Sequence, residues 1–145
     1  MGPRGWWIRF VGIALMTVLV VASAQTARPP ATASESFVVV TSAEQIIGTW
    51  MRPARYRRFD EDGTFRSASS ANALDGAPSA INAYRFEEAV MLVTEVAVSG
   101  VPSCDDAVGH YEVRLFESGD LQIVVIKDPC HARAGSTAWV YERVE

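Results

Sequence analysis

Three polar side chains at alternate positions of one segment could transfer protons. His110, Glu112 and Arg114 are spaced two residues apart, so on an extended strand they project from one face. An imidazole beside a carboxylate can act as a general acid or base where such a face borders a cleft. We favour the alternative interpretation, the water-facing side of a half-buried strand. The chain also lacks the nucleophile-elbow, zinc-protease and phosphate-loop motifs, so we do not predict an enzyme.

Cys104 and Cys130 are the only cysteines in the chain. In an exported protein an even number of cysteines indicates a disulfide, which here would stabilise the fold by about 3–4 kcal/mol. A metal site is the alternative, because thiolate, carboxylate and imidazole groups are all metal ligands. Further candidate ligands lie near the cysteines at Asp105, Asp106, His110, Asp128 and His131. Since no paired metal-ligand spacing is present, we predict the disulfide and neither a metal nor a cofactor.

An acidic turn and a group of arginines lie close together in the sequence. Asp60 and Asp62 precede Gly63 as in a calcium loop, but the other ligand positions of an EF-hand are not filled. We interpret this segment as a hairpin turn in which glycine supplies a positive φ. The arginines are Arg52, Arg55, Arg57 and Arg58. They could bind an anion, although we favour a solvated face paired with the acidic turn.

Residues 1–24 are predicted to be a secretory signal peptide. Arg4 and Arg9 give a positive start, residues 11–22 are apolar, and Ala22-Ser23-Ala24 matches a cleavage site. An uncleaved membrane anchor is the alternative, although the apolar stretch is short for a membrane span. We therefore expect a secreted or periplasmic protein with no stable membrane span after cleavage.

The remainder has the composition of a single exported domain. The full chain has 145 residues and a formal net charge of −4, and this acidic balance argues against a nucleic-acid partner. Residues 25–41 are predicted to be a flexible linker, rich in Pro, Ala, Thr and Ser, that ends in a short β-prone run from Phe37 to Val40. The domain then covers residues 42–145, and we expect it to be a monomer.

The domain is predicted to be all-β, with short turns between strands. The expected strands cover residues 47–52, 55–59, 64–67, 81–87, 90–98, 109–117, 121–127 and 137–144. Apart from one helical turn over 42–45 and another near 70–74, no helix is expected. Eight sequential antiparallel strands fold either as an up-and-down barrel or as a two-sheet sandwich. We predict the eight-stranded antiparallel up-and-down barrel, because it leaves no strand edge free.

The start of the first strand carries a family signature. Gly48-Thr49-Trp50 follows one helical turn, and this arrangement resembles the G-x-W motif of the lipocalin and calycin barrels. The resemblance implies that Gly48 permits a tight entry and that Trp50 closes the barrel floor. It also implies that Arg143, near the end of the last strand, packs across the indole as a cation–π pair.

The resemblance extends over residues 42–144, and the domain also resembles small bacterial lipocalin-like proteins. Those proteins share the hairpin from Phe59 to Phe65 and a cysteine pair near the sixth and seventh strands of the barrel. The T-D-Y motif that lipocalins carry in the middle of the chain is absent. The family implies a barrel that binds a small ligand.

Alternation of apolar and polar residues predicts which side chains face the barrel interior. In residues 90–98 we take Glu95 as the mark of the water-facing side, which turns Leu92 inward. The candidate ligand-contacting residues are Tyr84, Phe86, Leu92, Tyr111, Leu115 and Tyr141. An eight-stranded barrel either is filled by side chains or holds one small ligand. We predict that the domain binds a small hydrophobic or amphipathic molecule; the alternative is a structural or interaction module with a filled core.

Overall fold

The computed structural model describes residues 35–100 and 102–144, so the predicted leader and most of the linker lie outside the described residues. The described chain has two α-helices, α1 (Ala73–Gly76) and α2 (His131–Thr137), and one 3-10 turn, η1 (Ala43–Gln45). Its strands are β1 (Phe37–Val39), β2 (Gly48–Arg52), β3 (Arg55–Phe59), β4 (Thr64–Ala68), β5 (Ala80–Glu87), β6 (Val90–Val98), β7 (Gly109–Phe116), β8 (Leu121–Lys127) and β9 (Val140–Arg143).

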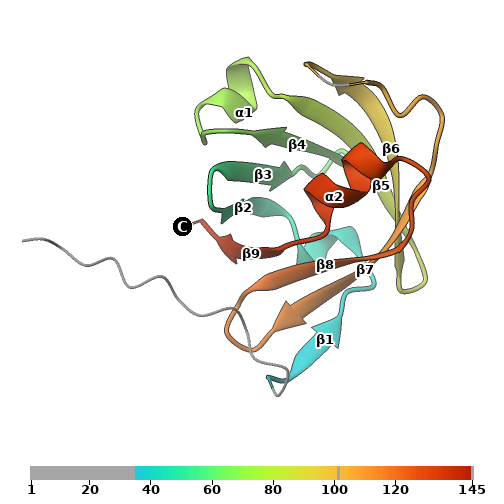
Figure 1. The fold of residues 1–145 in the computed structure, drawn as a ribbon. Helices are drawn as coiled ribbons and strands as arrows, with labels where there is room; N and C mark the ends of the chain where they lie inside the picture. Colours follow the sequence, from blue (N-terminus) through green and yellow to red (C-terminus); the bar gives the residue numbers. More distant parts are fainter. Residues whose placement is uncertain (1–34, 101, 145) are drawn as a thin grey trace, which may run out of the picture.

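Strands β2 to β9 form a closed antiparallel barrel (Figure 1). Each strand pairs with the next in the sequence, and β9 also pairs with β2, which joins the two ends of the sheet. The predicted up-and-down barrel is confirmed. The sandwich alternative is wrong, because one closed sheet replaces the two stacked sheets of a sandwich.

Strand β1 extends the sheet beyond the barrel. It pairs with residues 114–116 of β7, whereas β6 pairs only with residues 109–111 of that strand. Val40 follows β1 as a fully buried residue, and its N–H donates to the carbonyl oxygen of Val113 at 2.8 Å. The β-prone run at the end of the predicted linker is therefore part of the folded domain.

Helix α2 is the main departure from the predicted elements. The sequence predicts a loop and then a strand over 137–144, whereas the structure has a helix over His131–Thr137 and a strand only over Val140–Arg143. Alanines at positions 132 and 134 favour a helix, but seven residues are too few for an amphipathic repeat to be recognised. Among the described residues, no helix is both long and apolar enough to cross a membrane.

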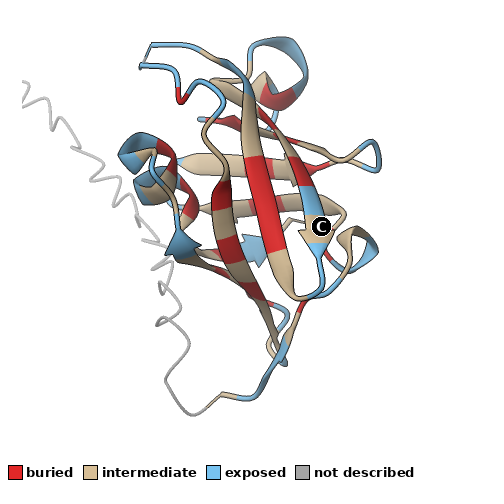
Figure 2. Cartoon of the chain, turned by 90° about the vertical axis from the view of Figure 1, so that its right-hand side faces the viewer, coloured by how far each residue is buried: buried red, intermediate tan, exposed pale blue. Residues whose placement is uncertain are grey.

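The barrel core is packed with aromatic and branched side chains, seen as buried segments of the strands in Figure 2. The predicted inward phase is correct for β5 and β7, where Tyr84 and Tyr111 are buried in the core. It is wrong for β6, where Met91 and Val93 belong to the core and Leu92 does not.

Leu92 lies on the outer face of β6. It pairs with Arg85 of β5 and His110 of β7, whose own neighbours Tyr84 and Tyr111 face the interior. The prediction fails because an acidic side chain is used as the mark of the water-facing side. Glu95 in fact shares the inward phase of Met91 and Val93.

The G-x-W segment packs into the barrel core at the start of β2. Trp50 is fully buried, and its Nε1 donates to the carbonyl oxygen of Ile46 at 2.8 Å. The guanidinium of Arg143 lies 5.0 Å from the centre of the Trp50 ring and donates to the carbonyl oxygen of Ile47 at 2.8 Å. Gly48 has φ +128°, a conformation that favours glycine. The contact expected between Arg143 and Trp50 is thus present.

Candidate functional site

The barrel interior changes from apolar to polar toward the end lined by α2. On each of four adjacent strands, a polar residue lies two positions from an inward-facing core residue, on the side of the cavity. The pairs are Phe59 and Arg57 on β3, Phe65 and Ser67 on β4, Tyr84 and Asn82 on β5, and Val93 and Glu95 on β6. Side chains two residues apart share one face of a strand, so the four polar groups face the interior. Strand pairing sets Arg57 opposite Ser67, and Asn82 opposite Glu95.

These polar groups line a cavity of about 240 Å³ together with α2 and the loop after β6. Arg57, Ser67 and Asn82 are buried and form its inner wall, whereas Ser99 and Pro102 are exposed at its edge. The cavity is therefore accessible from solvent on one side. It is larger than an engineered apolar cavity of about 150 Å³ that accepts benzene.

Arg57 is the most buried charged group of the cavity, with 2% of its surface exposed. Its guanidinium contacts the rings of Phe65 and Tyr141, 4.6 Å and 5.2 Å from their centres. Nε donates to the Ser67 hydroxyl at 3.2 Å and Nη2 to the Thr137 hydroxyl at 3.5 Å. Nη1 is buried without a hydrogen-bond partner among the described residues. Burial removes the charge from water and so lowers the pKa of this guanidinium.

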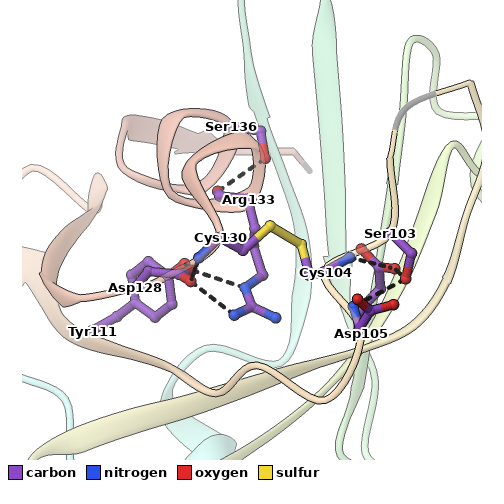
Figure 3. The surroundings of a disulfide bond; sticks show 9 residues. Ser103, Cys104, Asp105, Tyr111, Asp128, Cys130, Arg133 and Ser136 are labelled. Carbon is purple, nitrogen blue, oxygen red and sulfur yellow. Dashed lines mark hydrogen bonds and ion pairs between the residues drawn. A yellow bond between two sulfur atoms is a disulfide. The ribbon is translucent and has the colours of Figure 1, made fainter.

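Arg133 is a second buried arginine of the cavity and projects from α2 (Figure 3). Its Nε and Nη2 donate to the two carboxylate oxygens of Asp128, both at 2.8 Å. Asp128 also accepts hydrogen bonds from the Tyr111 hydroxyl and from the backbone N–H of Cys130. Nη1 of Arg133, like that of Arg57, has no partner within the described part of the chain.

The charge of Asp128 is stabilised by the groups around it. Burial acts to raise its pKa, but the hydrogen bonds from Arg133, Tyr111 and the Cys130 N–H outweigh burial, so the pKa of Asp128 is lowered. The pKa of Tyr111 is raised, first because the phenol is buried and then because it donates to Asp128. Asp128 is therefore an ionised carboxylate at neutral pH, and it fixes both α2 and the orientation of Arg133.

The disulfide Cys104–Cys130 joins the loop after β6 to the start of α2 (Figure 3). The predicted disulfide is confirmed, and the metal alternative is wrong for these thiols because they are bonded to each other. The residues that the structure describes include no group of three His, Cys, Asp or Glu side chains that could hold a metal ion. Glu95 accepts hydrogen bonds from the Ser103 hydroxyl and the Cys104 N–H, so the disulfide and Glu95 fix the same wall of the cavity.

The six predicted ligand-contacting residues are not among those that line this cavity. Those that face the interior, within the apolar core or packed against it, are Tyr84, Phe86, Tyr111, Leu115 and Tyr141. Leu92 lies on the outer face, as described above. The aromatic half of the barrel is thus filled by side chains, and the larger open space lies at the polar end. Leu115 also lines a second hollow of about 160 Å³ beside β1.

The polar face of β7 lies outside the barrel. Glu112 and Arg114 form an ion pair with 2.6 Å between carboxylate oxygen and Nε, on the face opposite the buried side chains of Tyr111 and Val113. Neither these two residues nor His110 lines the cavity. Their position agrees with the water-facing interpretation of this trio.

Arg57 is a cavity residue that the sequence interpretation misplaces. The interpretation as a solvated face is correct for Arg58, which forms ion pairs with Asp60 at 2.9 Å and with Asp75 at 2.8 Å on the outside of the sheet. It is wrong for Arg57, which faces the barrel interior. The signal was present in the sequence, because Phe59 lies two residues further along the same strand and must face the core.

Comparisons with known proteins assign no family to this chain. No protein-family model, curated protein or solved structure matches it. The likeness to lipocalins therefore rests on the G-x-W segment and the barrel itself, and function has to be argued from the chemistry of the cavity.

Proposed function

We propose that this domain is an exported, lipocalin-like barrel that binds one small amphipathic molecule in the cavity beside α2. The observation that carries the proposal is a solvent-accessible cavity of about 240 Å³ whose wall contains two buried arginines with unpartnered nitrogens. Ligand sites in proteins are concave and combine apolar surface with a few convergent polar groups. The disulfide supports a location in an oxidising compartment, consistent with the predicted signal peptide.

The wall of the cavity supports an amphipathic ligand over a purely hydrophobic one. Ala80, Val98 and Pro102 contribute apolar surface, while Arg57 and Asn82 contribute buried polar groups. A purely hydrophobic molecule would leave those polar groups without partners and out of water, which is unfavourable. The aromatic half of the barrel is filled, so the ligand is confined to the α2 end.

The filled aromatic half also favours a second candidate, a module that acts through its surface. Phe37 and Val38 of β1 are 44% and 57% exposed and lie side by side on the surface, where they could contact a partner. This candidate predicts that small molecules do not enter the cavity. The same experiment therefore separates the two functions.

A cavity-blocking variant tests the proposal. Ala132 lines the cavity from an exposed position on α2, so Ala132→Trp would fill the entrance without disturbing the core. Ligand-observed NMR is used to screen wild-type protein with neutral, cationic and anionic fragments, each small enough for the cavity. We expect hits that Ala132→Trp abolishes.

The matched control is His131→Trp, which places the same bulk on an exposed neighbouring position of α2 that does not line the cavity. We expect this variant to retain the hits. An absence of hits with the wild type, or hits that survive Ala132→Trp, would refute binding in this cavity and favour the surface module.

A further inference from the structure

The cavity has an excess of positive charge that its own residues do not balance. Three arginines line it, Arg55, Arg57 and Arg133, against a single carboxylate, that of Glu95. Arg133 is neutralised by Asp128. Among the described residues, no carboxylate lies within ion-pair distance of Arg57. A buried and unpaired guanidinium is costly unless something compensates it.

Both buried arginines are connected to α2, since Arg133 belongs to this helix and Arg57 donates hydrogen bonds to its C-terminal end. Arg57 donates Nη2 to the Ser136 carbonyl oxygen at 3.4 Å and to the Thr137 hydroxyl, and both of these residues belong to α2. Arg133 lies one helical turn before them, and residues three and four apart share one face of a helix. Each guanidinium keeps one buried nitrogen, Nη1, without an acceptor.

We propose that the cavity binds a small organic carboxylate whose charge balances that of the Arg57 guanidinium, which is buried and has no carboxylate within ion-pair distance among the described residues. This inference rests on the proposed function and specifies its ligand class. Guanidinium groups pair with carboxylates through strong, charge-assisted hydrogen bonds. The amide of Asn82, a residue that is 5% exposed and lines the same cavity, supplies a further donor on this wall.

Glu95 selects the charge of the ligand. Its carboxylate lines the same cavity. This negative charge repels a dianion such as phosphate more strongly than it repels a monoanion. The apolar surface of Ala80, Val98 and Pro102 suits the hydrocarbon body of an organic acid. The ligand class is therefore a monocarboxylate with a compact apolar body, not an inorganic anion.

Benzoate and benzamide form the test pair, because they have nearly the same shape and differ in charge. Binding to the full-length exported protein is measured by NMR, following the backbone amides and the Nε–H signals of the arginines. We expect benzoate to bind at least about tenfold more tightly than benzamide, the difference typical of one charged hydrogen bond. We also expect it to shift the Arg57 Nε–H signal, and inorganic phosphate to bind more weakly than benzoate.

Two variants sharpen the test. Arg57→Gln should weaken benzoate binding at least about tenfold and leave benzamide binding unchanged. Arg58→Gln is the matched control, because Arg58 is the next residue but pairs with Asp60 and Asp75 outside the barrel; benzoate should bind it as it binds the wild type. If Arg57→Gln does not fold, the test is made on wild-type protein alone. The ratio of the benzoate and benzamide affinities and the shift of the Arg57 Nε–H signal then decide whether the inference holds.

The outcomes separate this inference from the proposed function. Equal binding of benzoate and benzamide that Ala132→Trp abolishes would refute the carboxylate inference and leave a small-molecule site in place. Tighter binding of phosphate than of benzoate would refute the organic ligand class. No binding of any of the three would refute the carboxylate inference, and the neutral and cationic fragment hits would then decide the proposed function independently.

Discussion

Arg133 donates two parallel hydrogen bonds to the carboxylate of Asp128, and the side chains of both residues are almost completely buried, with 4% and 0% exposed. This pair connects the end of β8 to α2 across the wall of the cavity. Because a bidentate guanidinium–carboxylate contact is directional, it fixes the helix as well as the charge. The stability of the domain and the geometry of its cavity are therefore linked through these two residues.

Asp128→Asn should destabilise the fold strongly. The substitution keeps the shape of the side chain but leaves the buried Arg133 guanidinium without its counter-charge, a change that typically costs about 3–5 kcal/mol. The measurement is the free energy of unfolding in urea. Tyr111→Phe is the control, because it removes one hydrogen bond to Asp128 and no charge, and it should cost about 1 kcal/mol. Equal effects of the two variants would contradict a dominant role for the ion pair.

Stability should fall in acid because of the same carboxylate. The pKa of Asp128 is lowered below its ordinary value of 3.8 in the folded state, so its contribution to stability is complete above that value. The contribution is lost as pH falls below 3.8 toward the folded-state pKa. We expect the urea midpoint of the wild type to drop over this range, and that of Asp128→Asn to drop less.

Asp62→Asn serves as the control for the acid experiment. The pKa of Asp62 is also lowered, chiefly by hydrogen bonds from the Thr64 hydroxyl and N–H, but its side chain lies on the exposed hairpin turn. Solvent screens such exposed interactions, so this variant should follow the wild-type pH profile. A profile for Asp128→Asn as steep as that of the wild type would contradict the assignment.

Reduction of the disulfide should weaken both the fold and the cavity. The bond closes a loop with a sequence separation of 26 residues, for which the chain-entropy estimate is about 3–4 kcal/mol. We expect the melting temperature to fall by roughly 10 °C or more in reductant. Cys104→Ala/Cys130→Ala is the control and should melt at the lower temperature with or without reductant. An unchanged melting temperature after complete reduction would show that the hydrogen bonds of Asp128 and Arg57 hold α2 without the disulfide.

The barrel could be predicted from the sequence because its signals are local. Alternating strands and short turns recur through the domain, and the G-x-W segment marks the first strand. Helix α2 has no such signal, since its seven residues depend on Asp128 and the disulfide for their position. Those contacts are tertiary, so composition and periodicity do not reveal them.

The candidate site escaped prediction for a different reason. The usual assumption that charged residues face water places Arg57 and Glu95 outside the barrel. Both face inward, because the cavity and its hydrogen-bonding groups replace part of the water. Strand phase set by Phe59 and Val93 would have given the correct answer, and it would have placed both charges at the same end of the barrel.

Gly48 and Arg143 allow backbone strain to be separated from side-chain crowding at the start of β2. An added Cβ at Gly48 would lie 3.2 Å from Nη2 of Arg143, and the φ of +128° is unfavourable for any other residue. Gly48→Ala should cost about 1–3 kcal/mol, and Arg143→Ala about 0.5–1 kcal/mol through loss of the contact with Trp50. Nη2 is the mobile end of a long side chain and can move away from an added Cβ. Most of the destabilisation by Gly48→Ala should therefore persist in the double variant Gly48→Ala/Arg143→Ala. Unfolding free energies of the four proteins provide the test, and full recovery of stability in the double variant would show that crowding, not backbone strain, requires glycine here.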